Sequence, residues 1–243
     1  MARMTPPGSG TIAPALADRT PSLFTIAPKS AARAVALIAH GGKSRSNAAD
    51  SNLRSPALRM LPFSADLARA GRRRGLAVAQ LRYRVVGYNE GDPVRDVEWA
   101  IDQLASRFDG PVCLVGHSMG ARAVLRAAGH ERVTAVAGLA PWCTPAEPVH
   151  QLSGRTVMLV HGTDDRITDP AKSLDFARRA RESAVRLVRV ELPRTGHTML
   201  QRLPVWQSLT RRFVLGALAL EPMDERVEAA FALPGDQALR VRL

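Results

Sequence analysis

The feature that most constrains this chain is the stretch 111–128, where a glycine-bracketed serine separates an apolar run from a helical pattern. The run from Val112 to Val115 has the length and composition of a parallel strand buried on both faces. After the serine, apolar residues recur at helical spacing with arginines between them. A side chain at Gly116 or Gly120 would collide with the neighbouring strand or helix. We therefore predict a strand, a sharp turn and a helix, with the Ser118 hydroxyl presented at the end of the strand.

Strand-length and helix-length segments alternate through the rest of the chain. Further strands are predicted at 34–39, 76–81, 133–140, 156–160 and 185–192, and an uncertain edge strand at Leu23–Ile26. Helices are predicted at 62–74, from Asp92, after Asp169, after His197 and around Val227. This order is typical of an α/β protein with a mostly parallel sheet and helices on both faces. At 243 residues, one domain is expected.

The net charge of the chain suggests a nucleic-acid partner, but the arrangement of its arginines does not support one. The net charge is +12, which would ordinarily prompt a search for a nucleic-acid surface. The arginines are scattered, however, and no aromatic residues interleave them as a stacking platform would require. We expect no nucleic-acid partner, and the basic charge stays unexplained.

Composition also bears on compartment and cofactors. No apolar stretch approaches the ~20 residues that span a bilayer, and the N-terminus lacks the apolar segment of a signal peptide. A cytoplasmic protein without a membrane span is therefore expected. Cys113 and Cys143 show no metal-ligand spacing, so we expect neither a metal nor another cofactor.

Three motifs together resemble the α/β-hydrolase family: GHSMG around Ser118, HGTDD ending at Asp165, and GHT around His197. The resemblance covers residues 33–216. It implies an α/β-hydrolase fold, in which three loops after different parallel strands meet at one edge of the sheet. We divide the chain into an N-terminal segment 1–28, partly disordered, a catalytic domain 29–220 and a C-terminal extension 221–243. The extension either covers a sheet edge or mediates self-association into a homo-oligomer.

The resemblance also implies the roles of the three residues. Ser118 is expected as the nucleophile, Asp165 as the acid and His197 as the general base. Asp165 fits the family's spacing after Gly162, and Asp164 remains the alternative. Histidine is the side chain that can accept the serine proton near neutral pH and return it to a leaving group. The histidine beside the nucleophile, at position 117, points elsewhere and is not expected to act as base.

The same family resemblance implies further site residues. The backbone N–H groups of Met119 and Gly42 are expected to form an oxyanion hole, with Gly41 as the alternative to Gly42. Gly41, Tyr83 and Trp142 are candidate substrate-binding residues, although packing at strand ends explains the tyrosine equally well. About a dozen residues, 144–155, stand where the family inserts a cap, so no packed cap is expected. The pocket is open unless the polar loop 43–55 folds over it.

These expectations favour a carboxylesterase-like serine hydrolase acting on an ester or thioester of a small soluble molecule. Two alternatives stay open. An acyltransferase would use the same triad with an acceptor other than water. A binding or regulatory protein on a hydrolase fold would not turn over substrate, although such proteins usually lose members of the triad.

Overall fold

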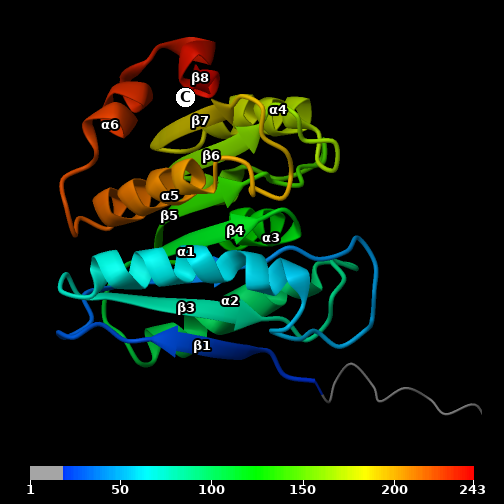
Figure 1. Ribbon diagram of the computed structural model, residues 1–243, viewed down its shortest axis with the longest axis vertical. Coiled ribbons are helices and arrows are strands. Elements are labelled where there is room, and N and C mark those ends of the chain that lie inside the picture. The colour runs from blue at the N-terminus through cyan, green and yellow to red at the C-terminus, as the bar shows by residue number, and fades with distance from the viewer. Residues whose placement is uncertain (1–18) are drawn as a thin grey trace, which may run out of the picture.

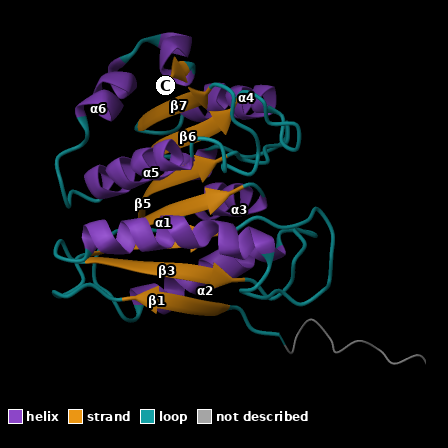
Figure 2. Cartoon of the chain, in the orientation of Figure 1, coloured by secondary structure: helices purple, strands orange, loops and turns teal. Residues whose placement is uncertain are grey.

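A twisted, mostly parallel sheet forms the centre of the structure (Figures 1 and 2). The computed structural model describes residues 19–243. In this part of the chain the strands are β1 (Ser22–Ile26), β2 (Ala34–Ala39), β3 (Leu76–Arg82), β4 (Val112–His117), β5 (Val133–Leu139), β6 (Thr156–Gly162), β7 (Arg186–Leu192) and β8 (Val241–Arg242). Their order is β1-β3-β2-β4-β5-β6-β7-β8. The β1 strand is antiparallel to β3, and the other neighbours are parallel.

Helices cover both faces of this sheet (Figure 1). They are α1 (Ser55–Gly71), α2 (Asp92–Ala105), α3 (Met119–Ala127), α4 (Pro170–Arg181), α5 (Leu203–Ala217) and α6 (Glu225–Ala232), with short 3-10 turns η2 (His150–Leu152) and η3 (Gly235–Leu239). The α2, α3 and α4 helices share one apolar core with the sheet, and α1, α5 and α6 share the other. The predicted fold class, an α/β fold with helices on both faces, is confirmed.

The central strands are apolar on both faces because each face meets a helix layer. In β2, Val35 and Leu37 pack into the α2–α3–α4 core, whereas Ala36 and Ile38 pack into the α1–α5–α6 core. All six residues of β2 are buried. This explains the unbroken apolar runs that the sequence shows at 34–39 and 112–115.

The order of the strands determines where a site can form. The chain passes from β2 outward to β3 and then returns to the other side of β2 to form β4. At such a reversal, the loops after neighbouring strands diverge and leave a crevice at the carboxyl edge of the sheet. Ala39 at the end of β2 pairs with Gly116 of β4. The loop after β2 therefore lies beside Ser118.

The start of α1 corrects a prediction. The helix was expected at 62–74, with Pro62 at its start, but it begins at Ser55 and contains Pro62. Pro56 occupies the first turn, where a missing N–H costs nothing. The buried side chains of Met60 and Phe63 continue the apolar face across Pro62. Packing thus overrides the local tendency of proline to end a helix.

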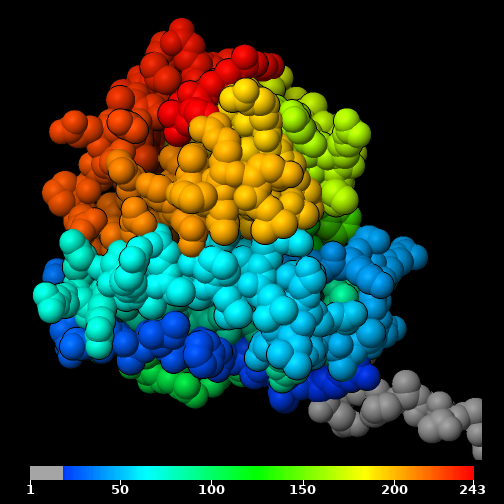
Figure 3. Space-filling view, in the orientation of Figure 1, coloured from blue at the N-terminus to red at the C-terminus, as the bar shows by residue number. Residues whose placement is uncertain are grey.

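The two ends of the described chain complete the sheet. The β1 strand lies at the edge anticipated for Leu23–Ile26, whereas the predicted disorder near the N-terminus falls outside the described residues. After α5, the chain forms α6 and then β8, in which Val241 pairs with Val190. Figure 3 shows this C-terminal segment lying against the region of α5. The tail thus covers the β7 edge, while self-association and the division at residues 28 and 220 stay predictions.

Candidate active site

Ser118 stands in a strained turn between β4 and α3. Its backbone angles are φ 57° and ψ −118°, a conformation that non-glycine residues rarely adopt. A Cβ on Gly116 would lie 2.5 Å from the carbonyl oxygen of Gly120, and a Cβ on Gly120 would lie 2.5 Å from that of Ala39. Both glycines are therefore required by close backbone approach, as the sequence predicts. The turn places the Ser118 side chain at the carboxyl edge of the sheet.

Three side chains meet at this edge. The Nε2 atom of His197 lies 2.9 Å from the Oγ of Ser118, and its Nδ1 lies 2.8 Å from the Oδ2 of Asp165. Because a carboxylate only accepts hydrogen bonds, His197 carries its proton on Nδ1, and its Nε2 accepts a hydrogen bond from the serine hydroxyl. Asp164, the alternative acid, is exposed and accepts a hydrogen bond from the hydroxyl of Thr163. The structure therefore brings Asp165, and not Asp164, to His197.

The Asp165 carboxylate is surrounded by donors. Its Oδ1 accepts from the backbone N–H groups of Ile167 and Thr168 at 2.8 and 2.9 Å. Its Oδ2 accepts from the Thr168 hydroxyl at 2.8 Å and from His161 Nε2 at 3.2 Å, in addition to His197. Burial raises the pKa of Asp165, but these hydrogen bonds outweigh burial and hold the pKa well below its ordinary value. The carboxylate is consequently ionised throughout the neutral range.

His161 and Thr168 support the Asp165 carboxylate through side-chain hydrogen bonds. His161, near the end of β6, lies with its Nε2 3.2 Å from Oδ2 of Asp165. Nothing in the sequence distinguished Thr168, whose hydroxyl also lies 3.1 Å from Nδ1 of His197. Its position three residues after the acid, within the same turn, is the signal that could have indicated it.

His117 contacts the backbone of the base. Its buried ring lies beside that of His197, with ring centroids 4.8 Å apart, and its Nε2 lies 2.9 Å from the His197 carbonyl oxygen. Burial and the neighbouring His197 lower the pKa of His117 from 6.5 to about 3. The ring is therefore neutral and donates its Nε2–H to that carbonyl. His117 thus holds the His197 backbone in place.

The glycines after β2 lie beside the nucleophile. A Cβ on Gly41 would lie 3.3 Å from the Cβ of Ser118, and one on Gly42 would lie 2.5 Å from the Met119 sulfur. Among residues 19–243, no acceptor engages the N–H of Gly42. The loop is held by a hydrogen bond from the N–H of Lys43 to a neighbouring loop. The Met119 side chain therefore packs against Gly42, and the oxyanion hole of Gly42 and Met119 stays a prediction.

The other two candidate substrate residues have different positions. Tyr83 is fully buried and donates its hydroxyl to the carbonyl oxygen of His40 at 3.3 Å. The structure therefore does not bring Tyr83 to the surface of the site, and the tyrosine instead supports the loop after β2. Trp142 is half-buried and lines a hollow of about 320 Å³ beside Asp165 and Thr168. Its position is compatible with a contact to substrate.

Residues 19–243 contain no cluster of three or more side chains suited to hold a metal ion. None of the helices in this same range is long and apolar enough to cross a membrane.

Comparison with known proteins establishes the fold. No family model matches the sequence, and no curated protein matches it significantly. Many solved structures do match. A putative α/β hydrolase from Agrobacterium tumefaciens is 13% identical, covering 84% of this chain and 94% of its own, with a TM-score of 0.63. A serine hydrolase without a lid from Xanthomonas campestris is 19% identical, covering 83% and 91%, with a TM-score of 0.60. Est1E from Butyrivibrio proteoclasticus, solved with ferulic acid, is 15% identical, covering 82% and 96%, with a TM-score of 0.61.

The chain therefore has the α/β-hydrolase fold. At identities of 13–19%, the comparisons establish the fold but neither the activity nor the substrate.

The neutral, buried state of His117 predicts how stability changes with pH. Because its pKa is lower in the folded chain than in the unfolded chain, protonation favours unfolding between pH 6.5 and about 3. This residue should therefore lower the free energy of unfolding by up to about 1.4 kcal/mol for each pH unit of acidification below 6.5. His117→Gln should lose stability less steeply than wild type. Urea unfolding at a series of pH values from neutral to mildly acidic measures the slopes.

The matched control is His150→Gln, since His150 is exposed. It should follow the wild-type slope. An unchanged slope in His117→Gln would contradict the neutral, buried state of His117.

Proposed function

We propose that this protein is a serine hydrolase that cleaves an ester or thioester through an acyl-enzyme on Ser118. The observation that carries the proposal is the continuous hydrogen-bonded chain from Ser118 through His197 to Asp165. These are the three groups that nucleophilic acyl transfer needs, in the chain order that α/β hydrolases use. The fold supplies the edge of the sheet on which they meet.

In the first half of the reaction, His197 Nε2 takes the proton from the Ser118 hydroxyl as Oγ attacks the carbonyl carbon of the substrate. The carbonyl oxygen becomes an oxyanion, which accepts hydrogen bonds from the N–H groups of Met119 and Gly42. His197 then donates its proton to the departing oxygen or sulfur. The alcohol or thiol leaves, and the acyl group stays on Ser118.

In the second half, water replaces the alcohol or thiol. His197 takes a proton from the water as the water oxygen attacks the acyl carbon. It then returns the proton to Ser118 Oγ as the carboxylic acid product departs. Asp165 keeps the Nδ1 proton in place and stabilises the imidazolium through both halves. The low pKa of Asp165 leaves its charge available for this role.

The lack of a cap between β5 and β6 supports a small, soluble substrate. The connection between β5 and β6 is residues 140–155, which include only the short turn η2 (His150–Leu152). The polar loop 43–55 pairs with the β3–α2 connection through isolated β-bridges from Lys43 to Gly87 and from Ala49 to Val85. Without a cap, a long acyl chain has no overlying apolar wall against which to bury.

Two structural neighbours are compatible with an ester substrate. One was solved with ferulic acid bound, and another is a monoacylglycerol lipase from Paleococcus ferrophilus, 15% identical with a TM-score of 0.56. These neighbours are compatible with an acyl substrate, and the lack of a cap is the reason to expect a short acyl chain.

The nucleophile is tested by covalent labelling. A fluorophosphonate probe should label the wild-type protein at one residue, Ser118, because only an activated serine displaces its leaving group readily. Ser118→Ala should show neither labelling nor ester hydrolysis. Labelling of another residue in the variant, located by peptide mass spectrometry, would overturn the assignment.

The two neighbouring aspartates provide a matched pair for testing the acid. Asp165→Asn should lower kcat by about 10⁴-fold, by analogy with a protease whose catalytic aspartate was replaced by asparagine, because the imidazole then loses its tautomeric control. Asp164→Asn should change kcat by less than about threefold, since its side chain contacts Thr163 and not His197. Steady-state kinetics with a chromogenic short-chain ester give both values. The reverse ranking would show that the acid has been assigned one residue too late.

Substrate size is tested with esters of graded acyl length. Each methylene that finds an apolar wall gains about 0.8 kcal/mol, so the lack of such a wall predicts that kcat/KM falls beyond roughly eight carbons. With no cap to open, the rate should show no jump when the substrate passes its solubility limit. Rates measured through that limit provide the test. A sharp rise there would mean that a segment covers the site, with 43–55 the first to examine.

A further inference from the structure

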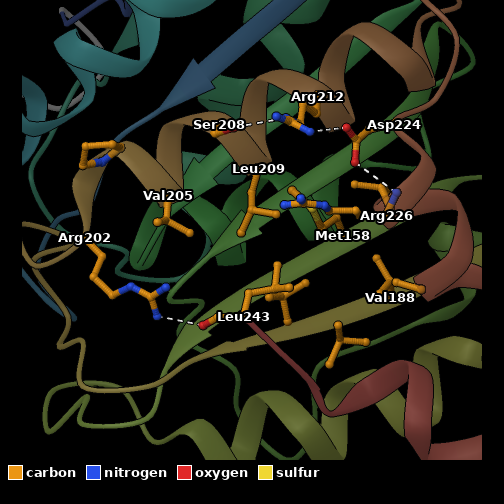
Figure 4. Close-up of a pocket in the computed structure, with 15 residues that line it drawn as sticks. Met158, Val188, Arg202, Val205, Ser208, Leu209, Arg212, Asp224, Arg226 and Leu243 are labelled. Atoms are coloured by element: carbon orange, nitrogen blue, oxygen red, sulfur yellow. Dashed lines mark hydrogen bonds and ion pairs between the residues drawn. The ribbon is translucent and has the colours of Figure 1, made fainter.

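A second cavity lies on the α1–α5–α6 face of the sheet, apart from the triad (Figure 4). Its volume is about 400 Å³, within the range of small-molecule sites. Its floor is made by Met158 and Val188, which lie within β6 and β7 and not at their carboxyl ends. None of Ser118, Asp165 and His197 lines it. The cavity is therefore not part of the candidate active site.

The walls of this cavity are aliphatic. Leu209 of α5, Val227 and Ala230 of α6, and Val241 of β8 close over the floor. A flexible aliphatic chain gains binding free energy with each methylene that it buries against such walls. The absence of aromatic side chains among the lining residues favours a chain over a flat ring that would stack.

The rim of the cavity is basic. Arg202, Arg212 and Arg226 line it, and Asp224 is the one acidic side chain among the lining residues. Arg212 pairs with Asp224, and Arg202 donates to the carbonyl oxygen of Leu243 at 2.7 Å. The guanidinium of Arg226 has no acceptor among residues 19–243. The rim thus keeps an uncompensated positive charge.

Figure 4 shows how this charge is placed. The Arg226 side chain extends from α6 across the cavity toward Leu209 and Met158. A cation held over an aliphatic cavity is complementary to a molecule with an aliphatic body and an anionic end. Arginine suits a carboxylate particularly well, because its planar fork can donate two parallel hydrogen bonds to the two oxygens.

We propose that this cavity is a binding site for an aliphatic carboxylate, with the tail against Met158, Val188 and Leu209 and the carboxylate on Arg226. Arg202 is the second donor within the rim. The site is independent of the proposed catalytic function, because no residue of the triad contributes to it. Binding can therefore be measured in a protein that cannot turn over esters.

The experiment is calorimetric titration of the full-length Ser118→Ala protein with decanoate below its micellar concentration. Decanol and decylammonium serve as neutral and cationic probes of equal chain length. Decanoate should bind at one site, and decanol about tenfold more weakly, because the neutral hydroxyl lacks the charge-assisted hydrogen bond to Arg226. Equal binding of all three probes, or no binding of decanoate, would overturn the proposal.

Variants at the rim test the position of the site without disturbing the core. Arg226→Gln should weaken decanoate binding about tenfold and leave decanol unchanged, and Arg226→Glu should reverse the preference toward decylammonium. The matched control is Arg107→Gln, an exposed arginine that follows α2 on the opposite face of the sheet, which should bind all three probes as Ser118→Ala does. Decanoate binding that is insensitive to both changes at Arg226 would show that the carboxylate binds elsewhere.

Discussion

The backbone conformation of Ser118 is the constraint on which the rest of this structure depends. A residue with φ 57° and ψ −118° costs on the order of 1–3 kcal/mol and persists only where its surroundings enforce it. Here the enforcement is close packing: Gly116 lies against the first turn of α3, and Gly120 lies against the end of β2. The same approach brings the glycine loop after β2 beside the nucleophile. One local strain thus fixes both the serine and the position of the glycine loop beside it.

The second constraint is the buried charge of Asp165. A carboxylate removed from water is stable only when donors replace its hydration, and here two backbone N–H groups, a hydroxyl and two imidazoles do so. Only His197 among these faces Ser118. The other donors hold the carboxylate rigid, while His117 holds the His197 backbone from the opposite side. The candidate base is therefore fixed at its ring and at its main chain.

Much of this arrangement could be predicted from the sequence because it rests on local patterns. Unbroken apolar runs mark strands buried on both faces, and the strands end within two residues of their predicted limits. The start of α1 could not be predicted, because packing around Pro62 overrides its local preference. Tyr83 is buried against the loop after β2, and Thr168 contacts His197 in another loop. Both contacts depend on segments that are distant in sequence. The second cavity likewise depends on how α6 and β8 fold back over β7.

The proposal that an acyl group passes through Ser118 is tested most directly by trapping it. The full-length protein would be mixed with a short-chain ester, quenched with acid during turnover, digested and examined by mass spectrometry. The proposed mechanism predicts that the peptide containing Ser118 is heavier by one acyl group and that this adduct is absent from Ser118→Ala. Ester hydrolysis at an undiminished rate in Ser118→Ala, or an acyl group found only on another peptide, would contradict it.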